Sequence, residues 1–234
     1  MALNFEGFAA DGDGIDLGTL NTTGGLSGLT LCCWIRPTAY QAGDEAVFFA
    51  KSNSTGNVGP WKLQIQDGGS DFRFILNTSV GGDHTLTDTT VFPTAQWMFV
   101  AGTYDGSNMR TFVNAVETAS LAVTGTVQSN AFPTRLAGVQ AGTFRRRFNG
   151  YMEDARIYSR ALSQAELESL FVSRGASPIV HGLLHWWRMQ ERAPGVVAAG
   201  AGVIKDSGPQ QFNGDVIDTP TYVEGILRGR RLYG

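Results

Sequence analysis

Short runs in which apolar and polar residues alternate recur along the first two thirds of the chain, and they restrict its fold more than any other feature. The segment WKLQIQ (61–66) is the clearest run, with Trp61, Leu63 and Ile65 at alternate positions and polar residues between them. Because successive side chains of a strand point to opposite faces of a sheet, this pattern predicts a strand with one buried face.

Other apolar or alternating runs predict further strands, and most are separated by Gly, Asn, Asp or Thr. The turn signal DGSN (105–108) lies between two of them and indicates a hairpin. Strands at this spacing indicate an antiparallel sandwich or barrel. Besides 61–66, we expect strands at 29–37, 45–51, 72–76, 96–104, 109–114 and 182–189.

One predicted hairpin has an unusual turn. In VNAVE (113–117), Ala115 occupies the position at which a tight Asn-Gly turn would have glycine. Alanine at positive φ costs about 1 kcal/mol, so we expect a different turn type here.

A single helix is predicted at residues 163–172. Ser163 is placed to cap its first turn, and Glu166 completes the S-x-x-E capping box. Leu167 and Leu170 recur at helical spacing and predict its buried face.

The composition excludes several classes of protein. The net charge of −3 gives no general attraction for nucleic acid. The two cysteines, Cys32 and Cys33, are adjacent and would point to opposite faces of a strand, so we expect free thiols. No apolar run is long enough to span a membrane, and no signal peptide is recognised, so we expect synthesis in the cytoplasm and no membrane insertion.

Several motifs together resemble a known family. They are ALNFEGFAADGDGIDLG, GLTLCCWIRPT, TAQWMFVAGTYDGSNMRTFVNA and FNGYMEDARIYSRALSQAELESLF, and they cover about residues 2–172. The chain resembles the LamG-like, concanavalin A-like jelly rolls. The resemblance implies an all-β fold, an antiparallel two-sheet jelly-roll sandwich with one short helix. It also implies a module that binds glycans or proteins or serves as a structural part, of a kind common in phage virion proteins.

The order of motifs departs from that family. Its members often begin with a segment that leads directly into ALNFDG, whereas the similar segment here, TPTYVEGILRGRRLYG, ends the chain. We therefore expect a circular permutation, with 1–172 as the jelly roll and 173–181 as a linker. Residues 182–234 would then supply strands that complete the same sandwich or that of a neighbouring subunit.

The sequence offers no catalytic set, so we expect no enzymatic activity. A glycosidase needs two carboxylates facing one cleft, but Glu153 and Asp154 are adjacent and would point to opposite faces of a strand. The resemblance implies at most a structural calcium ion, and no other cofactor is expected. Its candidate ligands are Glu6, Asp11, Asp13 and Asp154.

Aromatic side chains could form a platform on which a sugar stacks. Trp61 and Tyr40 lie near predicted loops and are the candidates, whereas Trp34, Trp97 and Trp186 lie within predicted strands and are expected in the core.

The leading hypothesis is a non-catalytic structural or binding module on a phage virion, such as a head decoration protein. A free carbohydrate-binding lectin is the alternative, and a glycoside hydrolase the third possibility. Expected partners are capsid or other virion proteins, glycans and further copies of the chain, but not nucleic acid. Two arginine clusters are the predicted partner contacts: Arg145, Arg146, Arg147, Arg228, Arg230 and Arg231.

Overall fold

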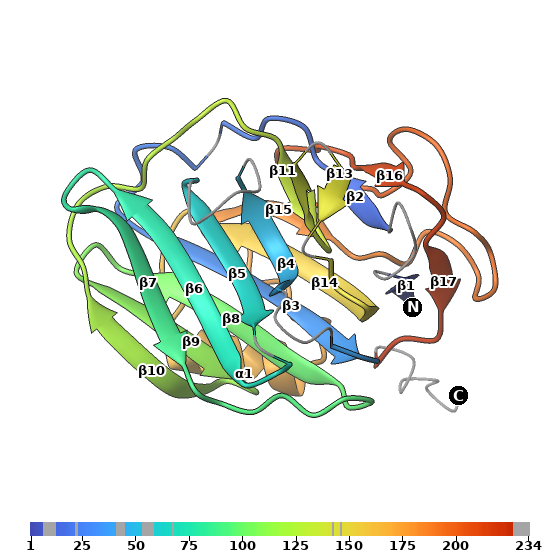
Figure 1. Ribbon diagram of the computed structural model, residues 1–234, viewed down its shortest axis with the longest axis horizontal. Helices are drawn as coiled ribbons and strands as arrows, with labels where there is room; N and C mark the ends of the chain where they lie inside the picture. The colour runs from blue at the N-terminus through green and yellow to red at the C-terminus, as the bar shows by residue number, and fades with distance from the viewer. Residues whose placement is uncertain are drawn as a thin grey trace.

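The computed structural model of the chain is a sandwich of two antiparallel sheets that lie face to face (Figure 1). This confirms the predicted all-β class and the sandwich architecture. The structure describes residues 1–6, 13–21, 23–40, 45–52, 59–66, 68–141, 143–145 and 147–226.

The first sheet has eight strands, of which β15 pairs with β14 beside the main path. Its remaining order is β10-β9-β8-β3-β14-β1-β17. The strands are β1 (Ala2–Phe5), β3 (Leu29–Pro37), β8 (Met98–Tyr104), β9 (Asn108–Val113), β10 (Val116–Ala122), β14 (Gly150–Tyr158), β15 (Leu183–Trp187) and β17 (Thr221–Val223).

The second sheet has seven strands in the order β16-β2-β11-β4-β5-β6-β7, and β12 and β13 form a separate hairpin. The strands of this sheet and of the hairpin are β2 (Gly14–Asp16), β4 (Glu45–Lys51), β5 (Trp61–Gln66), β6 (Asp71–Thr78), β7 (Gly82–Asp88), β11 (Thr134–Leu136), β12 (Val139–Ala141), β13 (Thr143–Arg145) and β16 (Asp215–Ile217).

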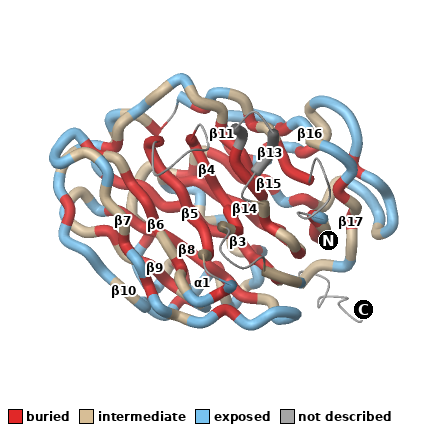
Figure 2. The backbone as a smooth tube through the Cα atoms, in the orientation of Figure 1, coloured by how far each residue is buried: buried red, intermediate tan, exposed pale blue. Residues whose placement is uncertain are grey.

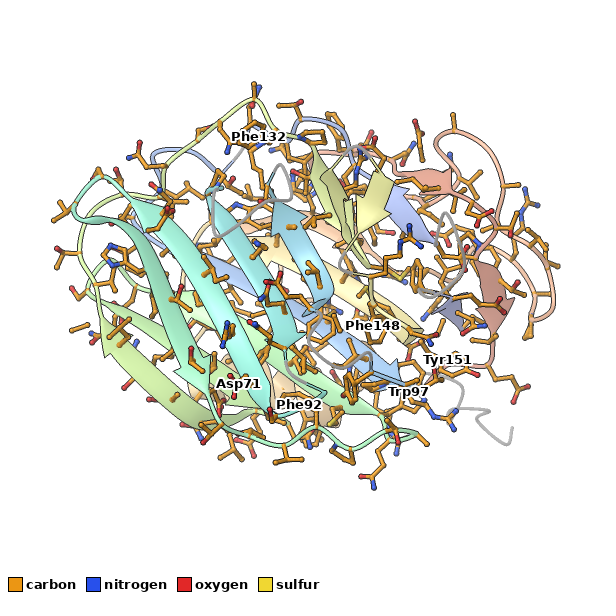
Figure 3. The ribbon with its side chains drawn as sticks, in the orientation of Figure 1. Asp71, Phe92, Trp97, Phe132, Phe148 and Tyr151 are labelled. Carbon is orange, nitrogen blue, oxygen red and sulfur yellow. The ribbon has the colours of Figure 1, made fainter. Side chains whose placement is uncertain are left out.

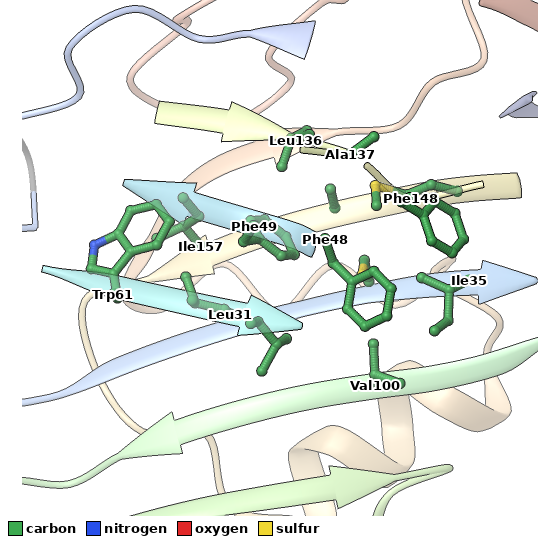
Figure 4. Close-up of a cluster of buried hydrophobic side chains, with 14 of the residues drawn as sticks. Leu31, Ile35, Phe48, Phe49, Trp61, Val100, Leu136, Ala137, Phe148 and Ile157 are labelled. Carbon is green, nitrogen blue, oxygen red and sulfur yellow. The ribbon is translucent and has the colours of Figure 1, made fainter. Parts of the chain in front are cut away.

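The main core fills the space between the sheets, and buried residues follow the strands in Figure 2. Leu31 and Ile35 enter it from the first sheet, and Phe48 and Trp61 enter it from the second (Figure 4). The strand and its inward face are confirmed in β5, because Trp61, Leu63 and Ile65 all belong to this core. The expectation of a single buried face is wrong, because Lys62 and Gln64 on the opposite face are 1% and 0% exposed.

A second cluster of buried residues covers the outer face of the first sheet, and we call it the outer cluster. It contains Trp34, Phe99 and Trp186 from the sheet and Leu167 and Leu170 from helix α1 (Gln164–Val172). The predicted capping box is confirmed, because the Ser163 hydroxyl accepts from the backbone N–H of Glu166 and the Glu166 carboxylate accepts from the backbone N–H of Ser163. No helix in the described part of the chain is long and apolar enough to cross a membrane.

The hairpin between β9 and β10 keeps the tight turn that its alanine disfavours. Val113 pairs with Val116, so the loop consists of Asn114 and Ala115, with φ angles of 51° and 65°. Two positive φ angles are the signature of a type I′ turn, so the expected change of turn type is wrong. Ala115 is 5% exposed and belongs to the outer cluster, and its packing there offsets the backbone strain.

The last described segments of the chain pair with strands near its beginning. β17 pairs with β1 through Leu3 and Tyr222, and β16 pairs with β2 through Ile15 and Val216. In Figure 1 the N-terminus accordingly lies beside β17. The division at residues 172 and 181, and the permutation itself, stay predictions.

Candidate functional site

Three side chains meet on the outer face of the first sheet, where β3 ends and β8 and β14 begin. Arg36 pairs directly with Tyr151. Ile35 pairs with Met98 in the antiparallel strand on its other side, so Trp97, the residue before Met98, lies next to Arg36. Because Ile35 and Met98 point into the main core, the alternate residues point outward. We call Trp97, Arg36 and Tyr151 the aromatic platform.

The two rings of the platform lie close together and both are partly exposed. Their centroids are 6.4 Å apart with the planes inclined at 50°, and Figure 3 shows both rings at one edge of the molecule. The Arg36 guanidinium carbon lies 5.2 Å from the centroid of the Tyr151 ring. These are favourable geometries for an aromatic pair and for a cation–π contact.

Among the described residues, the guanidinium of Arg36 has a hydrogen-bond partner at one of its three nitrogens. Its Nε donates to the backbone oxygen of Ala95 at 3.1 Å. The Ala95 N–H in turn donates to the backbone oxygen of Pro37 at 2.7 Å, which fixes this loop against the end of β3. Among the described residues, no group accepts a hydrogen bond from either Nη atom of Arg36.

Polar side chains extend the platform across the sheet. Asn4 of β1 pairs with Tyr151, and Thr221 of β17 pairs with Asn4, and both are partly exposed. The row therefore combines apolar ring faces with an amide, a hydroxyl and a guanidinium. This combination suits a sugar, whose ring presents C–H groups on one side and hydroxyl groups around its edge.

The outer cluster supports the platform from beneath. The Trp34 ring stacks on Phe171 of α1 with centroids 5.5 Å apart and planes inclined at 20°, and Trp34 also contacts Phe99 at 5.5 Å. Trp97 packs against this cluster. The Trp97 ring therefore rests on a closely packed layer and loses little conformational freedom on binding.

The aromatic residues predicted to form a sugar platform do not form it. Trp61 is fully buried in the main core and donates through Nε1 to the Thr23 hydroxyl at 3.1 Å. Tyr40 packs against the same core, and burial raises the pKa of its hydroxyl. Trp34 and Trp186 are buried as expected, but the expectation that Trp97 lies in the core is wrong.

Sequence alone could not separate Trp97 from its neighbours. In QWMFVAGTY (96–104) both alternating faces are apolar, because one face enters the main core and the other enters the outer cluster. The position of Trp97 at the edge of that cluster depends on the pairing register of three strands.

The adjacent carboxylates Glu153 and Asp154 lie on the same outer face, contrary to expectation. A bulge in β14 and a φ of 56° at Asp154 reverse the alternation. Glu153 accepts from the backbone N–H of Ile226 at 2.7 Å, and Asp154 accepts from Arg156 at 2.9 Å. Both carboxylates are at most 1% exposed, so neither is open to a substrate.

Asp13 and Asp154, two of the candidate calcium ligands, are bonded to other groups of the chain. Asp13 accepts backbone N–H groups of Glu6 at 2.7 Å and Thr219 at 3.0 Å, and burial raises the pKa of its carboxyl. Asp154 is held by Arg156, and Asp11 lies outside the described residues. No group of three His, Cys, Asp or Glu side chains in the described part of the chain could hold a metal ion.

Most of the predicted arginine contacts cannot be placed. Arg147 is partly buried, and Arg145 is described only as part of β13. Arg146, Arg228, Arg230 and Arg231 lie outside the described residues. Their role in partner binding stays a prediction.

Comparison with known families identifies the family to which this sandwich belongs. Residues 9–168 match the Laminin_G_3 model of the concanavalin A-like lectin/glucanases superfamily, and the chain belongs to that family. No curated protein sequence matches the chain.

Three solved structures share the fold at low sequence identity. A candidate carbohydrate-binding protein from Bacteroides ovatus has a TM-score of 0.71 and 19% identity over 96% of this chain, which spans 60% of that protein. The heptameric SAP-like pentraxin of Limulus polyphemus has a TM-score of 0.56 and 16% identity, with 76% and 84% of the two chains covered. The CBM40 of the Ruminococcus gnavus IT-sialidase, bound to α2,3-sialyllactose, has a TM-score of 0.52 and 20% identity, with 62% and 83% covered.

Proposed function

We propose that the protein is a non-catalytic carbohydrate-binding module and that the aromatic platform is its binding site. The observation that carries the proposal is the meeting of Trp97 and Tyr151, two partly exposed rings 6.4 Å apart, with the open guanidinium of Arg36. Solved structures of this fold include a candidate carbohydrate-binding protein and a module with bound sialyllactose, which supports the proposal.

The burial of two carboxylates of β14 supports the non-catalytic character. Glycoside hydrolysis requires two carboxyl groups that reach the substrate. Glu153 and Asp154 are buried and already bonded to Ile226 and Arg156, so they are part of the protein interior. We therefore expect a polysaccharide to be bound and released unchanged.

A glycan array with purified protein, in the presence and absence of millimolar calcium, tests the proposal. We expect a selective set of glycans, and the Trp97→Ala and Tyr151→Ala variants should each bind it roughly 3- to 10-fold more weakly. Phe212→Ala is the matched control, because Phe212 is 42% exposed and lies outside the platform. Absence of any selective glycan, or equal losses in all three variants, would contradict the proposal.

We also propose that this module is displayed on the surface of a phage particle, bound to capsid or other virion proteins. The resemblance to jelly rolls that recur in virion proteins supports this location, and a glycan-binding face would serve attachment there. Mass spectrometry and cryo-microscopy of purified particles provide the test. We expect the chain at a regular copy number, and its absence from purified particles would refute the location while leaving glycan binding intact.

A further inference from the structure

The geometry points to a more specific ligand: we infer that the aromatic platform selects glycans that carry a carboxylate, such as uronic or sialic acid residues. This inference rests on the proposed function and concerns the same site. It assigns stacking to Trp97 and Tyr151 and assigns recognition of the carboxylate to Arg36.

The first argument concerns the two Nη atoms of the Arg36 guanidinium. Its Nε is occupied by the Ala95 oxygen, and neither Nη atom has a hydrogen-bond partner among the described residues. Two parallel N–H groups of a guanidinium match the two oxygens of a carboxylate, and such paired hydrogen bonds are stronger than those to neutral groups.

The second argument is the charge around the Arg36 guanidinium. Arg36 is the charged member of the row formed by Trp97, Tyr151, Asn4 and Thr221. No described carboxylate lies within ion-pair distance of it. An acidic ligand therefore does not have to displace any described carboxylate from Arg36.

Other partly exposed arginines in the molecule differ in this respect. Arg73 pairs with Asp71, Arg110 pairs with Asp105, and Arg160 pairs with Glu166. Their guanidinium groups are already bonded to carboxylates of the chain. Arg36 presents the same chemical group beside two aromatic rings with its anion position open.

The third argument is that Arg36 is held in place before a ligand arrives. The bond to Ala95 and the contact with the Tyr151 ring fix both the stem and the plane of the guanidinium. Binding then costs little side-chain entropy. A lysine would keep the charge but would lose the two parallel N–H groups of the guanidinium.

Matched pairs of ligands test the inference by calorimetry: α2,3-sialyllactose against lactose, and polygalacturonate against its carboxyl-reduced form. We expect wild-type protein to prefer the acidic member of at least one pair by about tenfold or more, as charge-assisted bonds imply. Arg36→Gln should lower affinity for the acidic member about tenfold more than it lowers affinity for the neutral member, which removes the preference. Arg36→Lys should retain only a part of the preference, and that part should disappear at high salt.

Arg110→Gln is the control, because Arg110 is an exposed arginine far along the same sheet that already pairs with Asp105. Thermal unfolding of each variant verifies that it is folded. Equal affinity for acidic and neutral members, or a preference that survives in Arg36→Gln, would overturn the inference but leave the proposed function standing. Failure of every glycan on the array to bind would instead overturn the proposed function, and the inference with it.

Discussion

The main core and the outer cluster are buried to a similar degree but are held together by different forces. The main core consists of aliphatic and aromatic side chains such as Leu31, Phe48 and Trp61, which meet between the sheets. The outer cluster surrounds a buried ion pair, Asp154 and Arg156, at 1% and 0% exposure. Burial of apolar surface stabilises the first, whereas the second depends also on the pairing of this buried charge.

Arg156 makes several contacts around this buried charge. Its Nε and Nη2 donate to Asp154 Oδ1 at 3.0 and 2.9 Å, and its guanidinium lies 4.0 Å from the centroid of the Trp186 ring. Its Nη2 and Nη1 also donate to the backbone oxygens of Gly175, at 2.5 Å, and Ser177, at 3.0 Å. Burial raises the pKa of Asp154, although Arg156 acts in the opposite direction.

The same contacts determine where the chain runs after α1. Gly175 and Ser177 accept from Arg156, and the backbone oxygen of Ile179 accepts from the Tyr158 hydroxyl at 3.1 Å. Alternate carbonyls of this extended segment are therefore bonded to side chains of β14. A buried polar pair thus fixes a segment that its composition marks only as a linker.

The largest predicted effect is the loss of Arg156. The Arg156→Met variant leaves Asp154 buried without its cation. We expect the free energy of unfolding, measured in urea titrations, to fall by about 3–5 kcal/mol. Adding Asp154→Asn removes the unpaired charge and should restore about 1 kcal/mol or more. A double variant no more stable than Arg156→Met would show that the pair is not what holds the outer cluster.

In the main core, stability is lost when a shortened side chain leaves a cavity. Leu31 is fully buried, and Leu31→Ala should lower the free energy of unfolding by about 2–5 kcal/mol. Leu31→Met keeps the volume and should cost less than about 1.5 kcal/mol in the same titrations. Similar costs for both variants would mean that volume does not control this region.

A smaller effect is expected at the start of α1, which covers the outer cluster. The Arg160 guanidinium lowers the pKa of Glu166 from its ordinary 4.5 to about 2. A carboxyl whose pKa is lower in the folded state contributes stability above its unfolded pKa and loses it as the pH falls from 4.5 towards 2. Because the pair is partly exposed, we expect at most about 1 kcal/mol.

Urea titrations at about pH 6 and about pH 3 measure this contribution. Glu166→Gln should flatten the fall in stability between these pH values, relative to wild type. Glu168→Gln, on an exposed position of the same helix, should leave it unchanged. An undiminished fall in Glu166→Gln would assign the acid sensitivity to other carboxyl groups.

The smallest effect is predicted at the β9–β10 turn. Ala115→Gly relieves a positive φ, worth about 1 kcal/mol, but removes a buried methyl group worth about 0.8 kcal/mol, so the two nearly cancel. Ala95 has a φ of 62° but is exposed, so Ala95→Gly should stabilise the protein by up to about 1 kcal/mol in thermal unfolding. Equal gains in both variants would show that the Ala115 methyl contributes nothing to the outer cluster.

The comparison also explains which parts of the fold are readable from sequence. The alternation in 61–66 and the capping box at Ser163 are local patterns, and both predict their elements correctly. The bulge at Asp154 leaves no such pattern, because it depends on how β14 pairs with β3. Regular alternation of side chains along the strand would place the two adjacent carboxylates on opposite faces, and the bulge interrupts that alternation.

The candidate site was harder to predict than the fold. Arg36 and Tyr151 come from β3 and β14, and Trp97 directly precedes β8. These positions are far apart in sequence, and only the sheet register brings them together. Solvent exposure of an aromatic ring likewise depends on what covers the sheet. The sequence could indicate an aromatic sugar platform but not which rings would form it.

Fluorine NMR of protein labelled with 5-fluorotryptophan tests the central claim most directly. The chain has five tryptophans, and Trp34, Trp61, Trp186 and Trp187 are each at most 7% exposed, whereas Trp97 is partly exposed. A Trp97→Phe variant assigns the Trp97 signal. During titration with an acidic glycan found on the array, we predict that this signal shifts saturably and more than the other four. A saturable shift confined to the other tryptophans, with the Trp97 signal unmoved, would contradict binding at the platform.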